Sequence, residues 1–169
     1  MVHLAGIFFE RGGDTFKKVL AAGTRNLVEC AKKAGVRRFL YVSSLGADLK
    51  SRDRYLKAKA EAEQIVRESG LEYTLFRPTL IYGPDDELIY RYGRLAYHLP
   101  AVPIIASGQN PVRPILVNDA VSALLAALEQ PVSVGKEYVL GGAQVILRRD
   151  ITDTVIHVFR QKKFKIPIP

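Results

Sequence analysis

The sequence has very little cysteine, no long hydrophobic run and no export signal. Cys30 is the only cysteine among 169 residues, which excludes an internal disulfide framework. No apolar stretch approaches the roughly 20 residues that a helix needs to cross a bilayer. The first residues also lack the charged segment and the apolar stretch of a signal peptide. Together these absences predict a cytoplasmic protein without a membrane span.

The charge balance is basic, but its pattern is not that of a nucleic-acid-binding protein. The formal net charge is +8, and the basic residues occur as separated pairs such as Lys17-Lys18, Lys32-Lys33 and Arg37-Arg38. No aromatic residues alternate with them, as a platform for stacked bases would require. We therefore expect a solvated basic surface and no nucleic-acid partner.

Strand and helix patterns alternate along most of the chain. Hydrophobic residues make up 48% and charged residues 25%, as in an ordinary globular domain. The periodicity predicts strands at 2–5, 39–42, 72–76 and 137–140, helices at 14–34, 53–69, 88–99, 151–160 and from Asp119 onward, and an extended tail at 165–169. This alternation predicts an α/β fold, with a parallel sheet covered by helices on both faces.

The same pattern predicts how the chain is organised. We expect a single domain over residues 1–169, whose core strands and helices lie in 1–83. Prolines then break the chain into shorter pieces. Residues 84–169 are therefore expected to combine core elements with a small C-terminal lobe on the substrate side.

Tyr55 and Lys59 are the pair whose spacing points to chemistry. Four residues apart on a helix, they share one face. A lysine ammonium beside a phenol favours the phenolate and lowers the tyrosine pKa, so that the tyrosine can move a proton to or from a hydroxyl or carbonyl group. By itself the pair also fits a solvated helix face, because Tyr and Lys at this spacing are common.

The order of motifs around this pair strengthens the catalytic interpretation. A strand ending in Ser43-Ser44 precedes it, and the next strand ends in Arg77-Pro78. His3-Leu4-Ala5-Gly6 and residues 23–31 lie upstream. The set resembles the NAD(P)-dependent epimerase/dehydratase superfamily, the extended and atypical short-chain dehydrogenases/reductases. Residues 39–48 look most like the atypical branch, which includes NmrA-like redox sensors and the nucleotide-binding accessory subunit of respiratory complex I.

The resemblance implies a Rossmann-like sheet and a role for each motif residue. It implies NAD or NADP as the cofactor, a small-molecule substrate such as a sugar nucleotide or another carbonyl or hydroxyl compound, and no metal. For the cofactor, it would place Ala5 and Gly6 near the adenosine and pyrophosphate, and Pro78 and Leu80 beside the nicotinamide carboxamide. Ser43 and Ser44 would lie beside the nicotinamide ribose, which Lys59 would also bind. Tyr55 would be the catalytic acid/base, and Ser44 and Lys59 would assist it. Asp119 would cap a helix and would therefore have a structural role.

One departure from the family pattern concerns catalysis. Active extended members usually carry the catalytic hydroxyl one position after the Ser-Ser pair, and here that residue is Leu45. A leucine cannot hydrogen-bond a substrate oxygen. Either Ser44 takes that role or the chemistry is lost, and the second alternative makes the protein a non-catalytic nucleotide-binding sensor or an assembly subunit.

A second departure concerns the phosphate groups of the cofactor. The sequence contains no Gly-x-Gly-x-x-Gly loop, and Gly12-Gly13 and Gly141-Gly142 stand in the wrong context. The expectation is that the first, phosphate-binding βαβ part of the fold precedes this chain, which puts cofactor binding by these 169 residues in doubt. The strand at 2–5 would then be an exposed edge, through which the chain self-associates or binds a partner.

The other reactive residues are expected to be structural or solvated rather than metal ligands or nucleophiles. His3, His98 and His157 are far apart and have no second ligand at metal spacing. Cys30 is assigned to the apolar face of its helix, which predicts a buried thiol.

Overall fold

The computed structural model describes residues 1–84, 86, 90, 93–94, 97–99, 101–105, 108–158 and 164–168. These residues form two compact units, each described by itself. The first unit comprises residues 1–78 and 120–140, and the second comprises 79–119 and 141–169.

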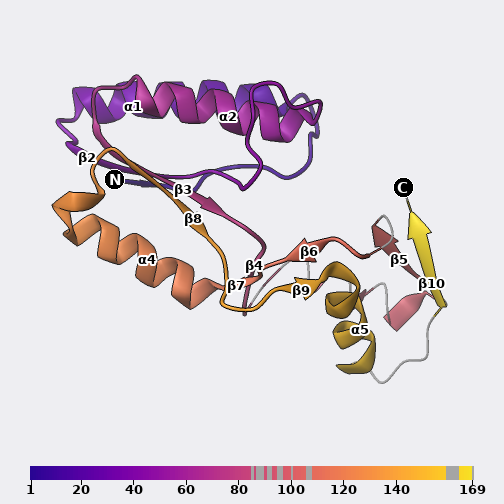
Figure 1. Cartoon of the computed structure of the whole chain (residues 1–169). Helices are drawn as coiled ribbons and strands as arrows, with labels where there is room; N and C mark the ends of the chain where they lie inside the picture. Colours follow the sequence, from indigo (N-terminus) through magenta and orange to yellow (C-terminus); the bar gives the residue numbers. More distant parts are fainter. Residues whose placement is uncertain are drawn as a thin grey trace. The chain divides into compact units, whose positions relative to one another are not determined.

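A four-stranded parallel sheet forms the centre of the first unit (Figure 1). Its strands are β1 (Val2–His3), β2 (Arg38–Val42), β3 (Glu72–Pro78) and β8 (Lys136–Leu140), in the order β1-β2-β3-β8. The pairing aligns Val2 with Leu40 and Leu40 with Thr74. The strands are rich in aromatic and aliphatic residues because helices bury both faces of the sheet.

Helices cover the two faces of this sheet (Figure 1). The π-helical turn η1 (Lys17–Ala22) runs directly into α1 (Gly23–Lys33), and both pack against α2 (Arg54–Arg67). Phe39, Tyr41 and Leu75 form the core with α1 and α2. On the other face, Leu40 and Phe76 pack against Ala127 of α4 (Val117–Glu129). The prediction of a parallel sheet with helices on both faces is therefore confirmed.

Local signals placed one helix end correctly but not every helix start. Gly35 follows α1 with a φ of 70°, a left-handed conformation that glycine adopts without strain. This helix was expected to begin at residue 14, but the hydroxyl that caps its first turn belongs to Thr15, whose Oγ1 accepts from Lys18 N at 3.2 Å. The Asp14 carboxylate lies 3.7 Å from Lys18 Nζ. Asp119 lies within the first turn of α4, which begins two residues earlier than its expected cap.

The expected burial of Cys30 is wrong, because its side chain is exposed. The residues that α1 buries are Thr24, Val28 and Ala31. An α-helix turns by about 100° per residue, so Cys30 lies about 200° from Val28 and points away from the core.

The second unit is built from short strand pairs and one helix. β4 (Ile81–Tyr82) pairs with β7 (Ile115–Leu116), β5 (Ala101–Ile105) with β10 (Phe164–Ile168), and β6 (Pro111–Val112) with β9 (Ile146–Leu147). α5 (Arg148–Val158) contributes Val155 and Ile156 to a small core with Val102. Most of the helix expected at 88–99, the end of the one expected at 151–160, and Pro169 lie outside the described residues.

Within the described sheet, β1 is an edge strand. Val2 is 42% exposed and Leu4, just beyond the strand, is 65% exposed. None of the described helices has the length and apolar character needed to span a membrane.

Candidate functional site

The predicted site residues of the first unit gather where the parallel strands end. β1 is followed by the exposed residues Ala5 and Gly6, and β2 is followed by Ser43. Backbone hydrogen bonds attach the segment after β2 to β3, from Ser43 N to Phe76 O at 2.7 Å and from Leu45 N to Pro78 O at 2.9 Å. Carboxyl ends of neighbouring parallel strands lie at the same sheet edge, where α/β folds bind their ligands.

The start of α2 fixes the orientation of Tyr55 and Lys59. The Asp53 carboxylate accepts hydrogen bonds from Tyr55 N at 2.8 Å and Leu56 N at 3.3 Å, so Asp53 is the N-cap of α2. Tyr55 therefore lies in the first turn and Lys59 one turn later. Lys59 Nζ donates to Val42 O at 3.1 Å and lies 6.0 Å from the centre of the Tyr55 ring.

Lys59 is a buried cation in an environment that weakens its charge. Only 6% of the residue is exposed. Burial lowers the pKa of Lys59 from 10.5 to about 8, although the negative charge of Glu63 partly opposes this shift. A Cβ placed on Gly6 would lie 3.8 Å from Lys59 Nζ and 3.2 Å from Leu20 Cδ2. The glycine thus keeps the backbone after β1 close to the ammonium group.

Tyr55 is half-buried beneath two phenylalanines. The Phe16 ring lies edge-on to it, with 5.5 Å between centroids, and the Phe8 ring lies 5.9 Å away. Burial raises the pKa of Tyr55, while a hydrogen bond with the Ser44 side chain lowers it and the Asp53 charge raises it. The expectation that Lys59 lowers the pKa of Tyr55 is therefore wrong. Burial of the phenol is the largest cause of the shift, and the Lys59 ammonium group donates to Val42 O, 6.0 Å from the centre of the Tyr55 ring.

The structure distinguishes the two hydroxyl candidates after β2. Ser44 is half-buried and interacts with Tyr55, whereas Ser43 is buried near the Glu63 carboxyl. Leu45 is 47% exposed. Of the two hydroxyls, only that of Ser44 interacts with Tyr55 among the described residues.

A buried ion-pair cluster lies one helical turn beyond Lys59. Glu63, which is 1% exposed, accepts from Arg77 at 2.6 Å and from Arg67 at 2.9 Å. Glu137 of β8 binds the same two arginines at 3.2 and 2.6 Å. Burial would raise the pKa of Glu63, but hydrogen bonds and charge from Arg77, with smaller contributions from Ser43 and Arg67, hold it below its usual range. The cluster joins α2 to β3 and β8 behind the site.

His3 has a structural role, as the sequence suggested. Its Nε2 is 2.9 Å from Thr24 Oγ1, and that hydroxyl donates to Leu20 O at 2.6 Å. Burial, helped by the charge of Lys59, lowers the pKa of His3 to about 4, so the ring is neutral at physiological pH. Among the described residues, no group of three His, Cys, Asp or Glu side chains is arranged to hold a metal ion.

Sequence reasoning missed the residues that surround the predicted pair. Glu63 could have been found, because it is four residues after Lys59 and so shares its helix face. Phe8 and Phe16 lie in and after an irregular loop, and no sequence period relates them to Tyr55. Pro78 is buried at the end of β3, whereas Leu80 belongs to the second unit.

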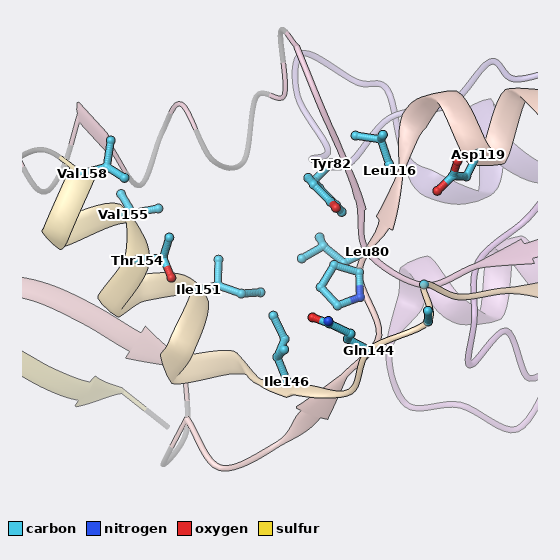
Figure 2. A pocket seen from close by; sticks show the side chains of 13 residues that line it. Leu80, Tyr82, Leu116, Asp119, Gln144, Ile146, Ile151, Thr154, Val155 and Val158 are labelled. Carbon is cyan, nitrogen blue, oxygen red and sulfur yellow. The ribbon is translucent and has the colours of Figure 1, made fainter.

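In that unit, Leu80 lines a pocket of about 650 Å³ (Figure 2). The side chains of Ile151, Val155 and Val158 from α5 approach it from one side, and Tyr82 and Leu116 from β4 and β7 approach it from the other. Its size is typical of a small-molecule site.

Replacing Lys59 by methionine is expected to change how stability depends on pH. The folded-state pKa of about 8 lies below the ordinary 10.5, so between these values the unfolded chain binds more protons than the folded chain. The free energy of unfolding of the wild type should therefore rise relative to Lys59→Met across this window, by up to about 3 kcal/mol.

Urea denaturation at pH 7, 8, 9 and 10 checks this expectation. Lys57→Met is the control, because Lys57 is exposed on the same helix. A difference between wild type and Lys59→Met that stayed constant over this range would contradict the burial argument.

Comparison with known proteins finds a family model and several relatives. A family model described as NAD(P)H-binding matches residues 2–95. NADH dehydrogenase (ubiquinone) 1 alpha subcomplex subunit 9, mitochondrial, of Arabidopsis thaliana is 30% identical over 100% of the chain and 43% of its own length. A ceramide reductase of Caulobacter vibrioides is 35% identical over 78% of the chain and 41% of its own length. The chain therefore spans less than half of these relatives.

A solved structure shares the fold. The dTDP-glucose 4,6-dehydratase of Streptomyces venezuelae, with NAD bound, superposes with a TM-score of 0.85 at 21% identity, covering 99% of the chain and 60% of that protein. The expected Rossmann-like α/β fold is confirmed.

Proposed function

Because the chain belongs to the NAD(P)H-binding family, we propose that it takes part in hydride transfer between NAD or NADP and a hydroxyl or carbonyl substrate. The observation that carries the proposal is the cluster of Tyr55, Ser44 and Lys59 at the carboxyl ends of the strands. Tyr55 moves the proton to or from the substrate oxygen, and Ser44 hydrogen-bonds that oxygen in the position that Leu45 cannot fill.

The residues after β1 and on α2 fit the ribose and nicotinamide part of the cofactor. Gly6 leaves the space that a Cβ would occupy beside Lys59 Nζ, and the ammonium group is held by Val42 O in a fixed direction. We assign Ala5 and Gly6 to the backbone approach of the cofactor, Lys59 to its ribose, and Pro78, at the end of β3, to its carboxamide side. When bound, the nicotinamide supplies or accepts the hydride.

Tyr55 must act as a phenol that gives up its proton only during reaction. Burial raises its pKa, so the neutral form dominates at pH 7. This favours reduction of a carbonyl, in which the phenol donates a proton as hydride arrives at carbon. Lys59, with a pKa near 8, is mostly charged at pH 7 and can donate a hydrogen bond to the ribose of the cofactor.

The test is a reductase assay with the full chain. NADPH or NADH is mixed with a panel of ketones that includes a sugar nucleotide ketone and a 3-keto lipid, and the loss of reduced-nicotinamide absorbance is followed. Carbonyl-dependent oxidation of the cofactor supports the proposal. Cofactor binding without turnover on any ketone supports the second candidate instead.

That second candidate is a non-catalytic nucleotide-binding subunit of a larger assembly. It is favoured by relatives in several organisms that are named as subunits of NADH dehydrogenase, and by Leu45 in place of a hydroxyl. The edge strand β1, with exposed Val2 and Leu4, would pair with a strand of another chain or of a second copy. Sedimentation of the chain at micromolar concentration would detect self-association.

The sequence and the names of the relatives indicate different compartments. We propose the cytoplasm from the sequence, while the plant and animal relatives carry the word mitochondrial in their names.

A further inference from the structure

We propose that the pocket of the second unit binds an uncharged lipid-like molecule, with a long apolar part and a hydroxyl or amide head. The proposal concerns residues of the second unit alone. It goes beyond the proposed hydride transfer and does not depend on Tyr55 or Lys59.

The wall of the pocket on the α5 side is an apolar stripe. Ile151, Val155 and Val158 are spaced by four and three residues, so they lie on one face of α5. Figure 2 shows their side chains directed toward the space that Leu80 also faces. Ile146 continues the apolar surface beyond the start of α5. Such a surface gains most from a ligand that removes apolar area from water.

The charge of the lining selects against phosphate. None of the described residues that line the pocket is a lysine or arginine, and its one charged member is Asp119. Diphosphate groups are normally bound by cationic side chains or by helix N-termini, and the carboxylate of Asp119 lies in the first turn of α4. A sugar nucleotide would therefore bring two phosphates to a site that repels them.

A few polar groups in the lining suit a neutral head group. Tyr82 and Thr154 supply hydroxyls, and Gln144 supplies an amide that both donates and accepts hydrogen bonds. Together with Asp119 they can bind hydroxyl and amide groups without any charge on the ligand. An apolar pocket with a few polar residues is the usual form of a small-molecule site.

Fluorescence titration of the full chain with NBD-labelled hexanoyl-ceramide, kept below its aggregation concentration, tests this proposal. Val158→Asp adds a charge to the apolar wall that the ligand must desolvate, and should weaken binding of the probe at least tenfold. Val132→Asp is the matched control, because Val132 is 70% exposed and Val158 is 68% exposed. That control should change the affinity less than twofold.

Two further measurements test the charge argument. UDP-glucose at millimolar concentration should leave the bound probe in place. Asp119→Asn should increase the affinity for NBD-hexanoic acid, an anionic probe, at least threefold and leave the ceramide probe unchanged. Equal binding of the ceramide probe by Val158→Asp and Val132→Asp, or its displacement by UDP-glucose, would overturn the proposal. Because no hydride transfer is measured, these outcomes are independent of the reductase assay.

Discussion

Tyr55→Phe is expected to lower kcat by about 10²–10⁴-fold on whichever ketone the full chain reduces, with little change in cofactor affinity. The substitution removes the hydroxyl that hydrogen-bonds with Ser44 but keeps the ring that packs against Phe8 and Phe16. The loss should therefore be chemical rather than structural. Steady-state kinetics with the reduced cofactor, together with a cofactor titration of the variant, measure the two effects separately.

Tyr73→Phe provides the control for this experiment. Tyr73 is also half-buried, and it packs beside the core between the sheet and α1 and α2. It should retain wild-type kcat, because its hydroxyl is not part of the cluster around Lys59. If Tyr55→Phe turned over substrate as fast as Tyr73→Phe, Tyr55 would not be the proton donor.

Glu63→Ala is expected to destabilise the fold by about 3–5 kcal/mol, because it leaves buried cationic groups without their partner. Arg77 and Arg67 both bind the Glu63 carboxylate, and Glu63 itself is almost fully buried. Chemical denaturation at pH 7 measures the loss. Glu68→Ala is the control, since Glu68 is exposed on the same segment and binds only Gln64 in the described structure.

The same variant has a predicted pH signature. The folded-state pKa of Glu63 lies below its usual range, so its ionisation stabilises the fold above the unfolded-state pKa and this contribution is lost as the pH falls through the folded-state value. The stabilities of wild type and Glu63→Ala should therefore converge in acid. A difference that instead grew as the pH fell would show that the carboxylate does not stabilise the fold through its charge.

Much of the first unit could be predicted because its signals are local. The period of the apolar residues marked α1 and α2, and Asp53 and Gly35 marked where a helix begins and where one ends. The apolar run at 39–42 predicted a strand that is buried on both faces of the sheet. Four-residue spacing then put Tyr55 and Lys59 on one helix face, which the structure retains.

The features that sequence reasoning missed or misjudged depend on contacts between distant segments. The pKa of Tyr55 follows from burial by Phe8 and Phe16, 47 and 39 residues away, and not from its spacing to Lys59. The ion pair between Arg77 of β3 and Glu63 of α2 joins a strand to a helix that lies earlier in the chain. The paired strands β4 and β7 are more than 30 residues apart in the sequence. Each has only two residues, which is too short for an alternation of apolar and polar residues to predict a strand.

The central claim is that the cluster around Lys59 holds a nicotinamide nucleotide, and calorimetric titration of the full chain with NADH and NADPH tests it most directly. We predict one site per chain. Lys59→Met should weaken binding of both nucleotides by at least tenfold, and Lys57→Met should bind as the wild type does. Absence of binding by either nucleotide, or equal binding by Lys59→Met and the wild type, would contradict the claim.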